Sequence, residues 1–239
     1  MKFSLYEFSA LTNFLKGVSN VADEITFIAS EDGLKCQVAS KSMTTMFEVF
    51  FKRDYFELFE VADNEAIRIV PSDLFKILRT VKHGESIVFD VGSYELHIIV
   101  DGNRRRNFTI SLLDEYDTFR ELPSFDLNIE STVNVDFLLD SLKDLDLMAS
   151  PVVILISEDN DLKFYGLNDY KGAVECAELG ETNNEGRATY NINNFKDVIN
   201  FPDISKEVKL KFDNDYPAIF KFENNNVELT TLIAPILEQ

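Results

Sequence analysis

The chain has 239 residues, of which 45% are hydrophobic and 27% charged, and its formal net charge at pH 7 is −19. This length allows one large core or two smaller cores. The sequence has no apolar run near the roughly 18 residues needed to span a bilayer and does not begin with a long apolar stretch. We therefore expect a soluble, intracellular protein. The 2 cysteines, Cys36 and Cys176, both lie in strand-like segments, which favours buried reduced thiols over a disulfide.

An internal repeat predicts that the chain consists of two similar units. The segment IASEDGLK at 28–35 resembles ISEDNDLK at 156–163, and each copy follows an amphipathic helix and an apolar strand. Each unit then needs to be only a modest layer that docks against its copy. We expect the function to depend on the space that the two repeated units enclose.

The first half predicts two helices among short strands. In the first helix, apolar residues recur with the i, i+3, i+7 spacing of a core-facing stripe, and in the second Pro71 suits the first turn and Gly84 ends the helix. The turn at Asp32-Gly33 joins two strands. The predicted helices are 7–21 and 71–81, and the predicted strands are 25–28, 34–38, 45–51, 86–91, 95–100 and 107–112.

The second half repeats this order after an acidic segment of little periodicity. We predict an N-terminal domain at 1–112, an interdomain linker at 113–126 and a C-terminal domain at 127–239. The turns between strands are too short for helical crossovers, which indicates an antiparallel α+β fold. The predicted helices are 135–147 and 193–201, and the predicted strands are 152–156, 162–165, 173–179, 208–212, 218–222 and 227–233.

The common signatures of enzymatic sites are missing from the sequence. It has no glycine-rich phosphate loop, no His-Glu-x-x-His and no Cys-x-x-Cys. His83 and His97 lack partners at metal-ligand spacing, and acidic pairs such as Asp144 and Asp146 arise by chance among 42 acidic residues. We expect no enzyme, no cofactor and no metal, and keep an acidic α+β enzyme as a distant alternative.

Positive charge gathers at a few positions in this acidic chain. The net charge argues against nucleic acid, but the distribution of charge matters as much as its sum. In the second helix Asp73 is the only acid against Lys76, Arg79 and Lys82, whose spacing of three places them along one side. Two interpretations stay open: a solvated helix face, or a concave surface that meets phosphates. Corresponding polar positions hold Lys16, Lys143 and Lys196, and a second basic spot is Arg104-Arg105-Arg106.

Several motifs in this order resemble the proliferating cell nuclear antigen family of DNA sliding clamps, in the shorter archaeal style, over essentially all 239 residues. They are Asp32-Gly33-Leu34, the helical Phe75-Lys76-Ile77-Leu78-Arg79, Leu122-Pro123, Asp215-Tyr216-Pro217 and the terminal Leu232-Ile233-Ala234-Pro235-Ile236.

The resemblance implies a duplicated two-domain clamp fold of class α+β. Three subunits would join head to tail into a closed ring, with antiparallel sheets outside and helices lining the hole. The ring would encircle duplex DNA without reading bases and tether DNA polymerase, clamp loader, ligase and nuclease through short peptides. It would lie with the chromosomal DNA. A heterotrimeric or checkpoint-type damage clamp is the alternative, and a self-trimer is the first choice.

The resemblance also implies three groups of site residues. The DNA-facing residues would be Lys16, Lys76, Arg79, Lys82, Arg105, Lys143 and Lys196. The partner-peptide pocket would contain Ala39, Met43, Met46, Leu122, Pro123, Pro217, Leu232, Ala234 and Pro235. The subunit interface would contain Phe108, Ile110 and Leu112 of one subunit and Val174, Cys176 and Leu179 of the next.

Two features depart from the family pattern. The third helix carries Asp136, Asp140, Asp144 and Asp146 against Lys143 alone, where a DNA-lining helix is expected to be neutral or basic. Leu232 stands where many relatives carry a tyrosine. We therefore expect the third helix to contribute little to DNA contact and the pocket to lack one hydroxyl group.

Overall fold

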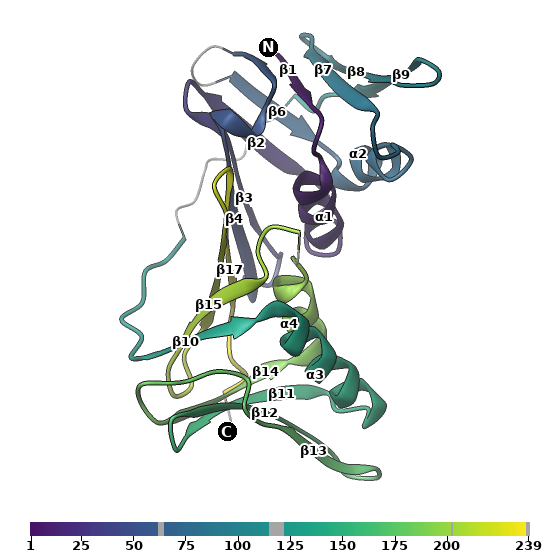
Figure 1. Ribbon diagram of the computed structural model, residues 1–239. Coiled ribbons are helices and arrows are strands. Elements are labelled where there is room, and N and C mark those ends of the chain that lie inside the picture. Colours follow the sequence, from purple (N-terminus) through teal and green to yellow (C-terminus); the bar gives the residue numbers. More distant parts are fainter. Residues whose placement is uncertain (62–64, 115–121, 202, 238–239) are drawn as a thin grey trace. The chain divides into compact units, whose positions relative to one another are not determined.

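The computed structural model describes residues 1–61, 65–114, 122–201 and 203–237 (Figure 1). The chain divides into two compact units. Unit 1 comprises Met1–Val38, Glu48–Glu121 and Asn224–Glu228, and unit 2 comprises Ala39–Phe47, Leu122–Glu223 and Leu229–Gln239. The predicted domain bounds at 112 and 127 stay a prediction.

Within its described residues, unit 1 contains two helices and strands of two antiparallel sheets. One sheet has the strand order β5-β1-β7-β8-β9, and the strands of the other follow the order β4-β3-β2-β6. Its elements are β1 (Lys2–Leu5), α1 (Ser9–Val18), β2 (Ile25–Ser30), β3 (Gly33–Ala39), β4 (Thr45–Lys52), a 3-10 turn (Arg53–Tyr55), β5 (Leu58–Glu60), β6 (Glu65–Ile69), α2 (Pro71–Leu78), β7 (Ser86–Val91), β8 (Glu95–Asp101) and β9 (Arg106–Ser111).

Unit 2 repeats this plan. Its sheets have the strand orders β13-β12-β11-β14 and β10-β15-β16-β17, and the first residues of β4 and of β17 belong to the opposite unit from the rest of each strand. Its elements are β10 (Ile129–Asn134), α3 (Val135–Leu147), β11 (Val152–Glu158), β12 (Asp161–Asn168), β13 (Gly172–Cys176), β14 (Gly186–Asn191), α4 (Ile192–Ile199), β15 (Glu207–Phe212), β16 (Ala218–Glu223) and β17 (Val227–Ile233).

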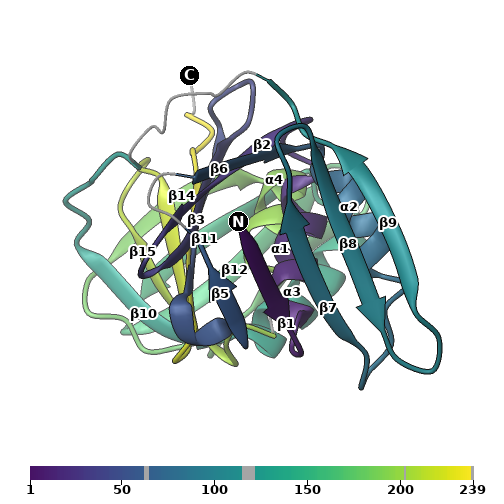
Figure 2. The ribbon, with the colours of Figure 1, turned by 90° about the horizontal axis from the view of Figure 1, so that it is seen from above.

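Each unit carries a pair of helices that contact each other, α1 with α2 and α3 with α4. In Figure 2, strands β1, β7, β8 and β9 of unit 1 lie side by side, with α1 and α2 beneath them. The apolar stripe of α1, including Leu11, Phe14 and Val18, is buried as its spacing predicts. Both pairs thus bury one face and leave a polar face exposed.

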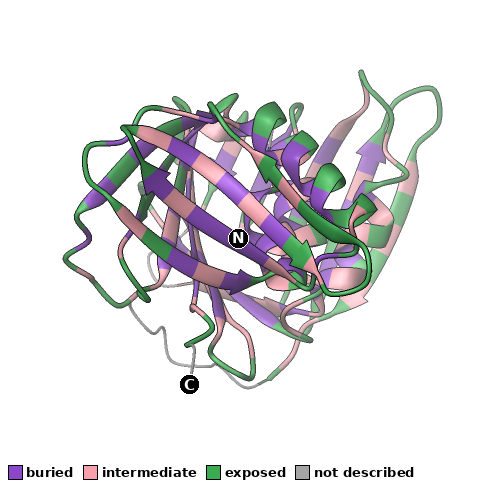
Figure 3. Ribbon diagram, turned by 90° about the horizontal axis from the view of Figure 1, so that it is seen from below, coloured by how far each residue is buried: buried purple, intermediate pink, exposed green. Residues whose placement is uncertain are grey.

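Alternating burial along the strands explains the layered core (Figure 3). In β8, for example, Leu96, Ile98 and Val100 are buried while Glu95 and His97 are exposed, because successive side chains of a strand point to opposite faces. Figure 3 shows this alternation as changing colour along single arrows. The sheets therefore present one apolar face to the helices and one polar face outward.

The predicted elements agree with the structure where the local pattern is strong. The bounds of α3 are those predicted, and both units have the expected α+β composition. The first two helices are shorter than predicted: α1 covers Ser9–Val18, and α2 ends at Leu78, so Lys82 lies beyond the helix and the predicted row of three helical cations is wrong. In the part of the chain that the structure describes, five strands were not predicted, namely β1, β5, β6, β10 and β14.

Candidate DNA-facing helices, partner pocket and subunit edges

The exposed face of the unit 1 helices is basic. Lys16 on α1 and Lys76 on α2 are exposed, and Arg79 follows α2 directly as its C-terminal cap. Lys76 lies 3.0 Å from Asp73, but both side chains are more than half exposed, so this pair is weak and easily exchanged for another anion. A cation at the C-terminal end, such as Arg79, also interacts favourably with the helix dipole. These three cations face solvent.

The exposed face of the unit 2 helices is acidic. Lys143 lies 2.6 Å from Asp140, and this hydrogen bond, with the charge of Asp140, raises the pKa of Lys143. Lys196 of α4 pairs with Asp146 of α3. Both predicted DNA-facing cations of unit 2 therefore have acidic partners. The acids exposed on α3 are Asp136, Asp140, Asp144 and Asp146.

The three arginines of the basic turn have different surroundings. The Nη1 atom of Arg106 donates to the Thr80 carbonyl oxygen and to Thr80 Oγ1, both at 3.1 Å, and its Nη2 atom pairs with Glu85. Arg106 thereby connects β9 to the turn after α2. Among the described residues, Arg104 and Arg105 form no ion pair and are exposed.

The predicted pocket residues all belong to unit 2. The chain after β17 is held by two backbone hydrogen bonds: Ala234 N–H donates to the Thr44 carbonyl at 2.8 Å, and Ile236 N–H donates to the Thr189 carbonyl at 2.7 Å. This tail therefore lies beside the loop before β4 and beside β14. The first of these bonds places Ala234 next to Thr44, which directly follows Met43; the pocket itself stays a prediction.

The predicted pocket residues differ in how much surface they offer. Met43 is 46% exposed, whereas Met46 and Leu232 are only 6% and 4% exposed and belong mainly to the core. Pro123 is exposed, and the half-buried members are Ala39, Leu122, Pro217, Ala234 and Pro235. The linker residues 115–121 lie outside the described part of the chain.

Three exposed apolar residues near the predicted pocket were not predicted as part of it. They are Tyr216, Ile236 and Leu237, which are 51%, 40% and 65% exposed. The hydroxyl of Tyr190 donates to the Tyr216 carbonyl at 2.9 Å, and Asp215 has a φ of 58°, so the turn before β16 holds Tyr216 outward. The Asp-Tyr-Pro motif contained this information, because a tyrosine in a polar turn has little core to enter.

Both strands predicted to pair between subunits are outer strands of their sheets. β9 ends one sheet of unit 1, and β13 ends one sheet of unit 2. Phe108 and Ile110 share one face of β9, Val174 and Cys176 share one face of β13, and all four are half-buried. An outer strand has unpaired backbone groups that can accept another strand.

Two predicted interface residues lie outside these strands. Leu112 follows β9, and its N–H donates to the Tyr94 carbonyl at 2.8 Å. Leu179 is only 7% exposed, and its N–H donates to the Leu162 carbonyl at 3.2 Å. The predicted strand 173–179 is too long because Glu178 takes a φ of 59°, which turns the chain inward. Leu179 therefore packs within its own unit.

Both cysteines are free thiols, as predicted. Cys36 is fully buried, and this burial raises its pKa, so it stays a neutral thiol. Cys176 is only partly buried, which differs from the prediction. Partial burial is the main cause that raises the pKa of Cys176, and the charges of Asp144 and Glu175 add to it. Glu175 belongs to the same strand, and Asp144 Oδ2 of α3 lies 4.0 Å from Cys176 Sγ.

The described residues were searched for metal-binding clusters and for membrane-spanning helices. The side chains of histidine, cysteine, aspartate and glutamate described here do not gather in any group of three that could hold a metal ion. No described helix is both long and apolar enough to cross a membrane.

Duplicated α+β units, each with a helix pair and an open outer strand, define the DNA-clamp class of folds. One chain of the crystal structure of a PCNA2-PCNA3 complex from Sulfolobus tokodaii superposes with a TM-score of 0.90 at 17% identity, covering 100% of both chains. The family "Proliferating cell nuclear antigen, N-terminal domain" matches residues 1–114. Residues 1–114 thus resemble the N-terminal domain of the proliferating cell nuclear antigen family, and the chain as a whole has the fold of the solved clamp structure.

Two curated relatives extend this similarity along the chain. A protein named "DNA polymerase sliding clamp" from Methanothermobacter thermautotrophicus is 22% identical over 99% of this chain and 98% of its own length. Another with the same name, from Thermofilum pendens, is 28% identical over 94% of both chains. The predicted resemblance is confirmed.

Proposed function

We propose that this protein is a DNA polymerase sliding clamp, a ring subunit that encircles duplex DNA and keeps a polymerase on its template. The observation that carries this proposal is the full-length similarity to proteins of that name, 99% of this chain in one case. The mechanism is topological: a closed ring cannot dissociate sideways from a long duplex. Such a protein is a scaffold without turnover and needs no cofactor.

Contact with DNA is proposed to be weak and directed at the phosphate backbone. A protein that slides must not read bases, and a few Lys and Arg contacts supply attraction that falls as salt rises. Lys16, Lys76 and Arg79 of unit 1 are the best candidates, because they are exposed and carry the excess positive charge of their helix pair. Of the other predicted cations, Lys143 and Lys196 have acidic partners and are proposed to contribute less.

The apolar surface of unit 2 is proposed to bind short peptides of partner proteins. Its exposed members are Met43, Tyr216, Ile236 and Leu237. Methionine adapts its shape to different ligands, and tyrosine offers a large apolar area with a polar end. Such a surface suits several partners, for which we propose polymerase, clamp loader, ligase and nuclease. The protein would act where the chromosomal DNA lies.

A polymerase assay tests the DNA contact. Lys76→Ala with Arg79→Ala should reduce the length of product that the clamp supports on circular primed DNA, because two phosphate contacts are lost. Lys209→Ala with Lys211→Ala is the matched control, since it removes two exposed cations from the sheet strand β15. Equal product lengths for both variants and the unchanged chain would exclude Lys76 and Arg79 from the mechanism.

Light scattering tests the ring. The chain should give about three times 27.3 kDa, because two outer strands are available for pairing between subunits. A strict monomer, alone and after addition of other clamp subunits from the same genome, would contradict the proposed function.

A further inference from the structure

Met43 differs from the other methionines in its exposure to solvent. The chain has 4 methionines, and all of them lie within the described residues. Met43 is 46% exposed, whereas Met46 is 6% exposed, Met148 is half-buried and the side chain of Met1 is 2% exposed. A dissolved oxidant reaches an exposed thioether more readily than a buried one. Exposure therefore separates Met43 from the other three.

Hydrogen bonds hold the loop around Met43 in one conformation. The Met43 N–H donates to the Ser40 carbonyl oxygen at 2.9 Å. The Ser40 Oγ atom accepts from the N–H groups of Thr44 and Thr45, both at 3.1 Å. Met43 itself has a φ of 57°, which turns the chain sharply at this residue. The Met43 side chain thus leaves the loop at a fixed position on the surface.

The same loop is bonded to two other segments of unit 2. The Ala234 N–H, in the tail after β17, donates to the Thr44 carbonyl oxygen at 2.8 Å. The Nδ2 atom of Asn194, on α4, donates to Thr44 Oγ1 at 3.3 Å. Met43 directly precedes Thr44, so it lies where the tail meets this loop. This place belongs to the surface that is proposed to bind peptides.

From this placement we infer that Met43 is a modification site, which a peroxide oxidises to methionine sulfoxide, and that its oxidation releases peptides from unit 2. The inference rests on the proposed peptide binding and adds its regulation. In the reaction the thioether sulfur attacks one oxygen of the peroxide, so a sulfur–oxygen bond forms and the oxygen–oxygen bond breaks. The sulfur loses two electrons and the peroxide gains them. The proton of the transferred oxygen passes to the departing oxygen, which leaves as water or an alcohol.

The sulfoxide changes the chemistry of an apolar surface. A thioether is apolar and adapts its shape to different ligands, whereas a sulfoxide is polar and chiral. A peptide that covers Met43 would remove the sulfoxide oxygen from water, which is unfavourable unless the peptide offers it a hydrogen bond. We therefore expect the affinity for an apolar peptide to fall by about tenfold or more on oxidation.

Limited oxidation of the folded full chain tests the modification site. The chain is treated with dilute hydrogen peroxide, the reaction is stopped with catalase at a series of times, and mass spectrometry of the digested chain gives the oxidation rate of each methionine. Met43 should react about tenfold faster than Met46, because burial excludes the reagent. In urea the two should react at similar rates, which controls for the local sequence. Equal rates for Met43, Met46 and Met148 in the folded chain would overturn the inference.

Fluorescence anisotropy of a labelled clamp-interacting peptide tests the consequence. The peroxide is removed before the peptide is added, so only the chain carries sulfoxide. The affinity should fall by about tenfold, and methionine sulfoxide reductases for both epimers should restore it. Dithiothreitol added before the peptide reverses oxidation of the free thiol of Cys176 to a disulfide or sulfenic acid but leaves the sulfoxide. The loss of affinity should persist after this reduction.

Three variants assign the loss to one sulfur atom. Met43→Leu defines its own starting affinity, and peroxide should leave that affinity unchanged because the oxidisable atom is gone. Met148→Leu is the matched control, since it removes a half-buried sulfur outside the proposed peptide surface, and peroxide should still weaken its peptide binding. Met43→Gln should bind the peptide more weakly without peroxide, because it places a polar group at the same position. Thermal unfolding should be the same before and after oxidation of Met43, which is exposed.

The outcomes separate this inference from the proposed function. Peptide affinity that survives complete oxidation of Met43, or that falls equally in Met43→Leu, would overturn the inference and leave the clamp function intact. An unoxidised chain that binds no peptide would contradict the proposed peptide surface, and with it the release of peptides by oxidation.

Discussion

Gly33, in the repeated motif, occupies a position where only glycine fits. Its φ is +150°, and a Cβ atom there would lie 2.1 Å from the carbonyl oxygen of Phe51. Gly33→Ala should therefore lower the free energy of unfolding by more than about 1 kcal/mol, measured by urea denaturation. Gly84→Ala is the control: Gly84 also has a positive φ, +86°, but no atom lies within 4 Å of its added Cβ. An equal loss of unfolding free energy in both variants would show that backbone strain at positive φ, and not the clash with the Phe51 carbonyl, causes the destabilisation.

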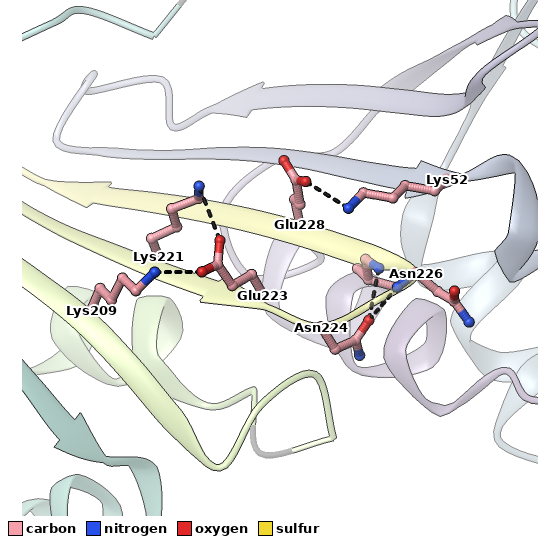
Figure 4. A network of polar contacts seen from close by, with 8 residues as sticks. Lys52, Lys209, Lys221, Glu223, Asn224, Asn226 and Glu228 are labelled. Atoms are coloured by element: carbon pink, nitrogen blue, oxygen red, sulfur yellow. Dashed lines mark hydrogen bonds and ion pairs between the residues drawn. The ribbon is translucent and has the colours of Figure 1, made fainter.

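Glu223 accepts hydrogen bonds from Lys209 and Lys221, and these contacts lower its pKa from 4.5 to about 2 (Figure 4). A carboxyl group with a lower pKa in the folded state stabilises the protein above pH 4.5, and this contribution is lost as the pH falls toward 2. Glu223→Gln should therefore make the unfolding midpoint less sensitive to acid across this range. The control is Glu228→Gln, which breaks the single pair with Lys52 at 2.8 Å. Identical pH profiles for Glu223→Gln and the unchanged chain would contradict the role of this pair of lysines.

At the level of elements, α3 and α4 begin in the same way. Asn134 Oδ1 accepts from Asp136 N–H at 2.8 Å, and Asn191 Oδ1 accepts from Asn193 N–H at 3.0 Å, so each asparagine satisfies a free helix donor. Asn134→Ala should cost about 1 kcal/mol of unfolding free energy, measured by urea denaturation. Asn193→Ala, at an exposed position inside α4, should cost nothing. An equal loss of unfolding free energy in both variants would show a general effect of removing an asparagine side chain, and not the loss of a helix cap.

Local periodicity predicted the helices and strands whose apolar pattern is regular within one short stretch of sequence. The bounds of α3 follow from the regular return of leucine, and β7 and β17 follow from apolar alternation next to turns. The unpredicted strands β1, β10 and β14 are short or carry mixed polar residues, and they form because neighbouring strands pair with them: β10 with β15, for example, over six residues. Such long-range pairing has no signature within the strand itself.

At the scale of the whole molecule, the tail after β17 is proposed to complete the peptide-binding surface of unit 2. Ending the chain after Ile233 should abolish binding of a clamp-interacting peptide, because Ile236 and Leu237 supply exposed apolar area and the tail is tied to Thr44 and Thr189. Fluorescence anisotropy of a labelled peptide measures this loss. Tyr94→Ala, at an exposed aromatic residue of unit 1, should bind the peptide as the unchanged chain does. Undiminished affinity after truncation would place the peptide elsewhere.

The candidate site was predicted only in part. The basic character of α2 and the acidic character of α3 were predicted from residue type and order. The two strands predicted to pair between subunits were implied by the family resemblance, and the structure places both of them at sheet edges. Leu179 and Lys82 were placed wrongly, because a left-handed residue at Glu178 and an early end of α2 are decided by neighbours beyond the local sequence. Tyr216, 51% exposed, was missed although its place in the polar Asp-Tyr-Pro turn indicates exposure.

The sequence by itself determined the duplication, the α+β class and the faces that helices and strands bury, since these follow from the spacing of apolar residues along a short stretch. Only the tertiary structure decided which strands end a sheet, which cations already have an acidic partner and which apolar side chains stay exposed. These properties depend on groups far apart in the chain: Lys196 pairs with Asp146 across two helices, and the Ala234 N–H donates to the Thr44 carbonyl. Spacing along the sequence does not encode such contacts, because they form only when the chain has folded.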